Sequence, residues 1–389
     1  MNVVELTAIH VRIPLRRPIR HASHRRTETD NVVVRCVLDD GTVGHGEGVP
    51  RDYVTGETID SCLDTLRRAD LAPQVGPWAD FDAALAGIER LTLPAVPGDD
   101  RGIANNAARC ALELALLDAC GRRSGVPLSD LTRRLAPDIH AARPWVRYSG
   151  VITSSTGVKM RLLAWLQRFY GFQHLKVKVG IAGQDDVRRL RTIRRCVGSR
   201  MSIRIDANEA WTPAEVVDRI RALEPVGLGA VEQPVPHEQV ECLAGVRRQI
   251  QTPIMLDESL CGAVDGGRAI EGGLCDVFNV RLSKCGGFIP SLRLAQMARR
   301  AGLACQLGCQ VGETAILSAA GRHFAASVGV LRYVEGSYDR LLVREALGRA
   351  DISFGRGGKA PALTGAGLGV EIDPLALARV EARRVTMMG

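Results

Sequence analysis

The 389-residue sequence contains few aromatic residues, no long apolar run and almost no lysine. Aromatic residues make up 4% of the chain, too few for the stacking platforms on which nucleic-acid-binding proteins hold bases. A membrane-spanning helix needs about 18 or more consecutive apolar residues, and no such run occurs. The N-terminus lacks the continuous apolar segment of a secretory signal. We therefore expect a cytoplasmic protein that binds neither nucleic acid nor membranes.

Paired cysteines are also missing. The eleven cysteines are scattered without a CxxC pair, and no further ligand near Cys305 and Cys309 completes a zinc site. We interpret them as reduced thiols that pack as small hydrophobic residues. The formal net charge of +8 comes largely from dispersed arginines, apart from one cluster, RHASHRR at 20–26. We interpret that cluster as a loop that is solvated or attracts an anionic small molecule.

The N-terminal third of the chain has an α+β pattern. Apolar and polar residues alternate in ELTAIHVRIPL, and NVVVRCVLDDGTVGHGEG contains two strand patterns around an Asp-Asp-Gly turn. Helical patterns follow at 57–70 and 80–92, and a third at 102–120 is apolar on more than one face. We expect one domain over residues 1–125.

The pattern changes near residue 145. Short apolar runs recur roughly every 25–30 residues, and amphipathic helical segments separate most of them. The eight runs are WVRYSGVI, HLKVKV, MSIRID, AVEQP, PIMLD, VFNVRL, ACQLG and RYVEG. Eight β/α units predict a closed parallel barrel over residues 140–355. Residues 356–389 contain a Gly-rich stretch and a short helical pattern at 374–383, and we expect this tail to return to the first domain.

Three acidic residues end consecutive strands of the predicted barrel. Asp206, Glu232 and Asp257 are 26 and 25 residues apart, and each spacing is one β/α unit. Because the chemistry of such barrels lies at the carboxyl ends of the strands, we expect these carboxylates side by side. Three neighbouring anions repel unless a cation lies among them, and an all-oxygen ligand set suits Mg²⁺ better than zinc. Asn208 and Glu258 are expected to support these ligands.

Only five lysines occur among the 51 basic residues, and two of them lie in the run HLKVKVG. Alternate residues of a strand share a face, so Lys176 and Lys178 both point into the predicted barrel. Two ammonium groups close together and near a divalent cation disfavour protonation, so one lysine can be neutral near pH 7 and act as a base. Arginine cannot do so, because its pKa is above about 12.

Together these features resemble the enolase superfamily, and within it the muconate lactonizing enzyme subgroup. The resemblance rests on the α+β domain, the barrel, the KxK motif and the three strand-end acids, and it covers essentially the whole chain. It implies an α/β fold: a modified (β/α)₇β TIM-type barrel with an α+β capping domain built from the N-terminal segment and the C-terminal tail. It also implies that Asp206, Glu232 and Asp257 bind one Mg²⁺ per subunit, which Mn²⁺ can replace, in a dimer or octamer.

The resemblance implies removal of a proton α to a carboxylate, giving an enediolate that the metal stabilises. Lys178 is then the acid/base at the substrate α-carbon. Lys176 is its partner, which tunes the pKa and touches the substrate carboxylate. The mandelate racemase subgroup has a histidine on the seventh strand, but that strand here reads ACQLGCQVGET, so that subgroup does not match.

One position departs from the subgroup. A lysine usually ends the sixth strand, in a segment like NIKL, whereas the matching segment here is NVRLSKCGG, with Arg281 at that place. Because arginine is a poor proton carrier, we favour a one-base cycloisomerase, or a dehydratase or other lyase, that uses Lys178. The alternative is a racemase or epimerase of amino-acid derivatives or dipeptides, with Lys284 or another group as the second acid/base. A barrel that only binds a ligand is a third interpretation, which the intact motifs disfavour.

Substrate specificity is expected to come from the capping loops and the last two strands. The candidates are the loops RHASHRRTETD and VPRDYVTGET, the latter with Tyr53, and the acids Glu313, Glu335 and Asp339. In dipeptide epimerases, acids at the eighth strand bind the substrate ammonium, and Glu335 lies at about that place. Alternatively, Glu335 pairs with a nearby arginine. The resemblance implies a small-molecule carboxylate as substrate and does not extend to any one compound.

Overall fold

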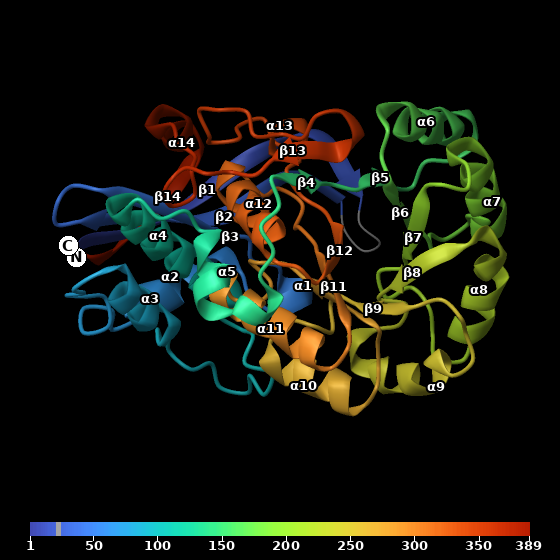
Figure 1. Cartoon of the computed structure of the whole chain (residues 1–389), viewed down its shortest axis with the longest axis horizontal. Coiled ribbons are helices and arrows are strands. Elements are labelled where there is room, and N and C mark those ends of the chain that lie inside the picture. Colours follow the sequence, from blue (N-terminus) through green and yellow to red (C-terminus); the bar gives the residue numbers. More distant parts are fainter. Residues whose placement is uncertain (21–24) are drawn as a thin grey trace.

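The two ends of the chain meet in one antiparallel sheet (Figure 1). The computed structural model describes residues 1–20 and 25–389. Its capping sheet has the order β14-β1-β2-β3, with the strands β1 (Val3–Arg20), β2 (Arg25–Leu38), β3 (Val43–Gly48) and β14 (Glu381–Met388). The predicted return of the C-terminal tail is confirmed. The helix expected at 374–383 is shorter, because α14 (Pro374–Val380) gives way to the strand that pairs with β1.

Helices of the capping domain cover the sheet at close range. The helices on the sheet are α2 (Ile59–Arg68) and α4 (Asn106–Ser124), and α3 (Phe81–Glu89) packs against α4. Two shorter helices are α1 (Asp52–Thr55) and α5 (Asp130–Leu135), and α5 contacts a helix of the barrel, α12 (Ala315–Ser327). Alternate glycines of β3 allow α4 to approach, since a Cβ at Gly46 would lie 2.0 Å from the carbonyl oxygen of Ala111. The GHGEG segment therefore specifies a close helix–sheet contact.

Eight parallel strands form the curled sheet of the barrel, in chain order and each beside the next. They are β5 (Gly150–Ile152), β6 (His174–Lys178), β7 (Ser202–Asp206), β8 (Leu228–Glu232), β9 (Ile254–Leu256), β10 (Val277–Val280), β11 (Ala304–Leu307) and β12 (Leu331–Val334). The Ser149 amide donates to the Val334 carbonyl at 2.8 Å and so links the two edges. The predicted barrel fold is confirmed.

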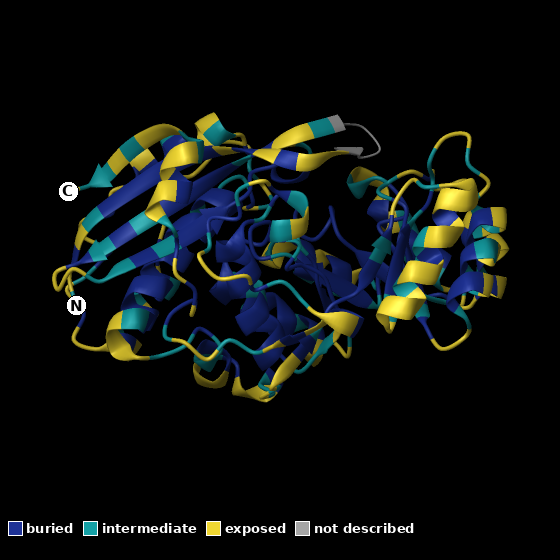
Figure 2. Cartoon of the chain, turned by 90° about the horizontal axis from the view of Figure 1, so that it is seen from above, coloured by how far each residue is buried: buried dark blue, intermediate teal, exposed yellow. Residues whose placement is uncertain are grey.

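Helices cover the outside of the barrel, and the buried strands lie inside them (Figures 1 and 2). They are α6 (Gly157–Tyr170), α7 (Asp186–Val197), α8 (Val216–Leu223), α9 (Leu243–Arg247), α10 (Ala263–Glu271), α11 (Phe288–Arg300) and α12 (Ala315–Ser327). The short α13 (Asp339–Leu342) contacts β1 of the capping sheet. The run WVRYSGVI, expected as one strand, divides into β4 (Trp145–Arg147), which pairs with β13 (Lys359–Pro361), and β5. The boundaries predicted at 125, 140 and 355 stay predictions.

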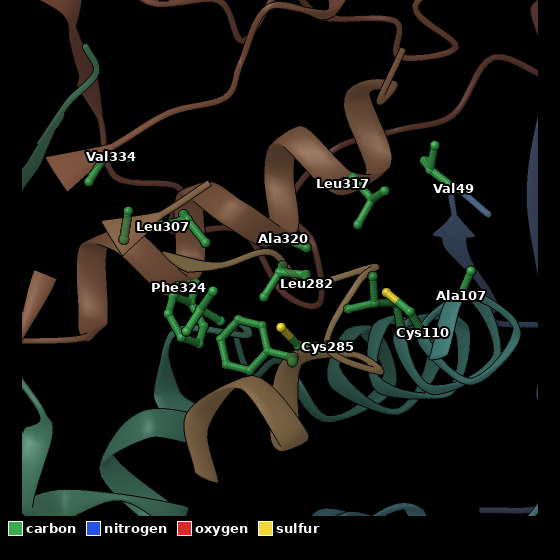
Figure 3. Packing of buried hydrophobic residues seen from close by; sticks show 14 of the residues in the cluster. Val49, Ala107, Cys110, Leu282, Cys285, Leu307, Leu317, Ala320, Phe324 and Val334 are labelled. Atoms are coloured by element: carbon green, nitrogen blue, oxygen red, sulfur yellow. The ribbon is translucent and has the colours of Figure 1, made fainter. Parts of the chain in front are cut away.

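An apolar core joins the capping domain to the barrel. Figure 3 shows Val49 and Ala107 of the capping domain beside Leu282 and Leu317 of the barrel, and all four are buried. Two buried carboxylates reinforce this contact at helix N-termini, where the free amide groups favour a negative charge. Glu47 accepts from the amides of Thr314 and Leu317 at the start of α12, and Glu113 accepts from those of Phe288 and Ile289 at the start of α11.

Membrane-spanning helices and paired cysteines were both unexpected from the sequence. No helix within 1–20 and 25–389 is long and apolar enough to cross a membrane. All eleven cysteines are free, and nine of them are buried, as expected of thiols that pack as small hydrophobic residues.

Candidate active site

Three of the predicted site residues, Lys178, Asp206 and Glu232, are in register across three neighbouring strands, whereas Lys176 is paired with Arg204. Lys178 is the pairing partner of Asp206, and Asp206 is that of Glu232. Asp257 directly follows β9, the next strand in the sheet. Each of the three acids is at most 1% exposed. The structure therefore brings the predicted ligand set and the KxK motif to one rim of the barrel.

Lys176 is surrounded by carboxylates. Its Nζ lies 2.8 Å from Glu335 Oε2, 3.4 Å from Glu232 Oε1 and 3.5 Å from Asp206 Oδ2. Burial alone would lower the pKa of Lys176, but these three acids hold that pKa well above its usual value. Lys176 is thus a fixed cation in this arrangement, in contrast to a base that must lose its proton.

Lys178 is the more open of the two lysines. Its side chain is 23% exposed, compared with 7% for that of Lys176. Its Nζ lies 2.5 Å from Asn208 Oδ1 and 3.8 Å from Asp206 Oδ2. Asn208 in turn donates to Glu258 Oε1 at 3.3 Å. Asn208 therefore orients the ammonium of Lys178 while leaving it accessible.

Left-handed backbone follows β7 and β8. Asn208, Glu209 and Gln233 have φ angles of 44°, 66° and 35°, which are costly for residues other than glycine. The conformation is held by local contacts. The amide and Nδ1 of His237 lie 2.8 and 2.7 Å from Glu209 Oε1, and Gln233 Oε1 accepts from the Asp257 amide at 2.9 Å. Our sequence analysis missed Glu209, Gln233 and His237, because no periodic pattern reports backbone strain.

Two cations lie against Asp257. The guanidinium of Arg281 contacts Asp257 Oδ2 and lies 3.6 Å from Glu232 Oε1. Lys284 Nζ lies 2.8 Å from Asp257 Oδ1, 2.7 Å from the Asp257 carbonyl oxygen and 2.8 Å from that of Asn279. Burial would raise the pKa of Asp257, but Arg281 and Lys284 hold it well below its usual value. Lys284 is 1% exposed, and its three N–H donors are all used.

Asp206, Glu232 and Asp257 are the predicted ligands of a metal ion. Among the described residues, no group of three or more His, Cys, Asp or Glu side chains is arranged to hold a metal ion, because Arg281 and Lys176 lie between the carboxylates. The donor chemistry nevertheless fits Mg²⁺, which prefers carboxylate oxygens. Burial, with a further contribution from Asp206, raises the pKa of Glu232 to about 7 even though Lys176 opposes it. A divalent cation would stabilise the charged form of Glu232.

Glu335 is bound on both oxygens. Oε2 accepts from Lys176, and Oε1 is paired with Arg204, whose guanidinium also donates to Ser149 Oγ at 3.1 Å. Burial would raise the pKa of Glu335, but Lys176 and Arg204 lower it to about 2. The arginine pairing that was the alternative for Glu335 is the arrangement that the structure shows.

The other predicted specificity residues lie around the rim. Glu313 accepts from the Gln310 amide at 2.7 Å, and burial raises its pKa to about 8. Tyr53 is half-buried on α1, with the Arg26 guanidinium 5.7 Å from its ring centre. Asp339 is buried and accepts from Ser318 Oγ at 3.1 Å. Residues 25–30 of the predicted loop 20–30 belong to β2, and residues 21–24 lie outside the described residues.

Three buried polar residues inside the barrel also escaped the sequence analysis. Asn279 donates to Glu232 Oε1 at 2.9 Å, Gln306 donates to Oε2 at 3.4 Å, and Arg204 pairs with Glu335. Arg204 and Asn279 lie two residues before Asp206 and Arg281, on the same strand face. The sequence signal that could have identified Arg204 and Asn279 was a polar residue two positions before a candidate site residue at a strand end.

Fold and site together define an α/β-barrel enzyme whose charged groups lie at the carboxyl ends of the strands, beneath a capping domain. Two family models match the chain. "Mandelate racemase / muconate lactonizing enzyme, N-terminal domain" covers residues 3–132, and "Enolase C-terminal domain-like" covers residues 161–376. The chain belongs to the enolase superfamily, in the mandelate racemase/muconate lactonizing enzyme family. The resemblance stated from the sequence is confirmed.

Known relatives match over most of their length. A hydrophobic dipeptide epimerase of Enterococcus faecalis is 31% identical over 83% of this chain and 88% of its own. An N-succinyl-L-Arg/Lys racemase of Bacillus cereus is 29% identical over 95% of this chain and 96% of its own. A crystal structure of a racemase of that description has a TM-score of 0.85. The dipeptide epimerase of Cytophaga hutchinsonii, solved with Mg and D-Ala-L-Val, has a TM-score of 0.84 at 25% identity and covers 100% of both chains.

Proposed function

We propose that this protein is a Mg²⁺-dependent racemase or epimerase that exchanges the proton α to the carboxylate of an amino-acid derivative. The observation that carries the proposal is the position of Lys178, partly exposed and in register with Asp206 and Glu232. The Enterococcus, Bacillus and Cytophaga relatives are racemases or epimerases, which supports this alternative better than the cycloisomerase or lyase that the sequence analysis favoured.

Asp206, Glu232 and Asp257 would hold the metal ion. When bound, the cation would draw charge from a substrate carboxylate and so lower the pKa of the neighbouring C–H bond. Lys178 would remove the α-proton, with Asn208 fixing the direction of its Nζ. Lys176, held by three carboxylates, would keep its charge and face the substrate carboxylate.

We assign the substrate face opposite Lys178 to Arg281. It directly follows β10, which is four strands from β6 in the eight-stranded order and therefore lies across the barrel from Lys178. Lys284 does not serve there, since all its donors bind Asp257 and Asn279. Because arginine rarely loses its proton, a water molecule beside the guanidinium would give the proton on this face, and the hydroxide left behind would be reprotonated by the Lys178 ammonium that the first transfer forms.

Arg281 also fits a second function. A one-base reaction, in which Lys178 alone handles the proton, needs only a fixed positive charge on the opposite side. The two functions differ in stereochemistry. A racemase or epimerase inverts the α-carbon, whereas a one-base cycloisomerase or lyase does not.

Two acids that follow the eighth strand, β12, indicate which substrates can bind. Glu335 is bound by Lys176 and Arg204, and Asp339 is buried against Ser318. Both oxygens of Glu335 are therefore occupied, so this carboxylate is not free to bind a substrate ammonium. We therefore assign the protein an N-acylated amino acid, which has no ammonium at the α-nitrogen, in preference to a dipeptide with a free N-terminus.

Chiral chromatography tests this assignment. The protein with Mg²⁺ would be incubated with single enantiomers of N-acetyl and N-succinyl amino acids and with dipeptides. We expect the N-acylated compounds to be interconverted and the dipeptides to be unchanged. Interconversion of dipeptides alone would contradict the substrate class. Loss of a β-group or ring closure without inversion would favour the one-base function.

A further inference from the structure

The base of the barrel, at the amino ends of the strands, has a cavity of its own. This recess of about 530 Å³ lies where β9, β10 and β12 begin, and the end of α9 and the segments that follow α9 and α10 form its walls. Asp206 and Glu232 end their strands on the opposite side of the barrel. We call the recess the base cavity, and its polar lining consists of Arg247, Arg248, Gln251, Thr252, Asp276 and Arg332.

Three arginines and one aspartate give the base cavity a net charge of +2. The guanidinium of Arg247 is paired with Asp276 and donates to the Gly273 carbonyl at 2.6 Å. Within the described ranges, Arg248 and Arg332 form no ion pair with a carboxylate, and both are exposed. The excess positive charge therefore lies on two guanidinium groups that have no counter-ion.

The carboxylates around the cavity do not neutralise these two arginines. Asp276 binds Arg247 and also accepts from a backbone amide of β9 at 2.8 Å. Glu224 accepts from the amide and Oγ1 of Thr252 at 2.9 and 3.1 Å. Glu271 precedes Gly272 in the chain but does not line the cavity. A ligand that brings its own negative charge would supply what the wall lacks.

Positive charge extends from Arg332 across the base of the barrel. Its guanidinium lies 5.3 Å from the ring centre of the buried Tyr333, a contact that holds the side chain without neutralising it. His174 begins β6 and lies edge-on to the same ring, with 5.3 Å between ring centres. Burial, together with Arg204, Arg147 and Arg332, lowers the pKa of His174 to about 4. The charges that act on this histidine are thus all positive.

We propose that the base cavity binds a small organic dianion, a phosphate monoester or a dicarboxylate, at a site separate from the active site. A dianion matches the net charge of the lining, and guanidinium groups bind carboxylate and phosphate oxygens in pairs. Small-molecule sites usually have volumes of about 300–1,000 Å³, a range that includes this cavity. Of the described residues that line it, none is aromatic, so it lacks a platform on which a nucleic-acid base would stack.

The two unpaired guanidinium groups belong to separate walls of the cavity. Arg248 directly follows α9, and Arg332 is the second residue of β12. This arrangement suits a ligand that has a carboxylate at each end, or one phosphate group between the two arginines. The exposed Gln251 adds a carboxamide donor for a further oxygen. Arg247 shapes the wall between them, because Asp276 and a carbonyl already hold its guanidinium.

Isothermal titration calorimetry at constant ionic strength tests the proposal. The ligands are inorganic phosphate, glycerol 3-phosphate, succinate and, as a monoanion, acetate. The base variant carries Arg248→Gln and Arg332→Gln. The matched control carries Arg188→Gln and Arg191→Gln, because these two arginines are also exposed and lie on α7, away from the cavity. Arg248→Gln alone covers the case in which loss of the Arg332 contact with Tyr333 prevents folding, and circular dichroism checks each variant.

We expect saturable binding of a dianion at one site per chain, with acetate at least tenfold weaker. Loss of two charge-assisted contacts should weaken binding to the base variant at least tenfold, while the control stays within twofold of the unaltered protein. Tighter binding of glycerol 3-phosphate than of succinate would assign a phosphate monoester, and the reverse order a dicarboxylate. Cations of the active site can also bind these anions, so dianion binding that is undiminished in the base variant would overturn the proposal. An equal loss in the control, or no saturable binding to the unaltered protein, would also overturn it.

Discussion

Lys284 binds the inner side of Asp257 with its whole ammonium group, at 2.8 Å to Oδ1 and 2.7 Å to the backbone oxygen, and it uses its third donor on Asn279. The sequence analysis considered this lysine as a second acid/base. We propose a different role for it, which is to hold a carboxylate at the rim from behind.

Replacing Lys284 by Met should therefore destabilise the fold. Loss of one partner from a buried ion pair typically costs about 3–5 kcal/mol, because the other charge stays buried without compensation. Urea denaturation would measure the free energy of unfolding, with Lys359→Met as the control at an exposed lysine. A stable Lys284→Met protein that loses proton exchange with one enantiomer alone would instead make Lys284 the second acid/base.

The Glu335 ion pairs should give an acid-dependent stability. The pKa of Glu335 is lowered to about 2 in the folded protein, below its usual value of 4.5. Its contribution is fully present above about pH 4.5 and is lost as the pH falls toward 2. Glu335→Gln should thus cost a few kcal/mol at pH 7, and the cost should shrink between pH 4.5 and 2. Unfolding curves at several pH values would show this, and a cost independent of pH would argue against the charge pairing.

His237 should contribute to stability with the opposite pH dependence to Glu335. The hydrogen bond to Glu209 raises the pKa of His237 above 6.5, with a smaller contribution from Glu238, whereas partial burial and Arg101 oppose it. A raised pKa stabilises the fold below about pH 6.5, and this contribution disappears as the pH rises through the folded value. His237→Asn should therefore be less stable than the unaltered protein at pH 5.5 and closer to it at pH 8.5. Equal differences at both pH values would show that only the neutral hydrogen bond matters.

Mg²⁺ should stabilise the protein through the three acids. A ligand that binds only the folded state at 100 times its Kd adds about 2.7 kcal/mol. Thermal unfolding with and without Mg²⁺ would measure the shift, and Asp257→Asn should remove it. Asp351→Asn serves as the control, because Asp351 is exposed. If the unaltered protein shows no shift, the metal proposal fails and the interpretation as a ligand-binding barrel returns.

The sequence predicted most about the residues whose positions follow from a regular spacing, such as the β/α repeat or the alternation along a strand. The spacing of Asp206, Glu232 and Asp257 predicted three neighbouring strand ends, and the alternation of Lys176 and Lys178 predicted one strand face. Pairings between distant strands were not predictable, because no local pattern specifies them. The sequence analysis expected an arginine near Glu335 and a returning tail, but it could name neither Arg204 as the partner nor β1 as the strand that pairs with β14.

Transfer of the α-proton by Lys178 is the central claim, and proton NMR in D₂O tests it most directly. One enantiomer of an N-acylated amino acid would be incubated with Mg²⁺ and the unaltered protein, Lys178→Ala, or the control Lys359→Ala. General acid/base groups contribute about 10²–10⁴-fold, so Lys178→Ala should slow deuterium incorporation by that factor. Deuterium should appear with inversion in the unaltered protein and the control. Exchange that survives Lys178→Ala would contradict the account, and exchange with retention alone would replace it with the one-base reaction.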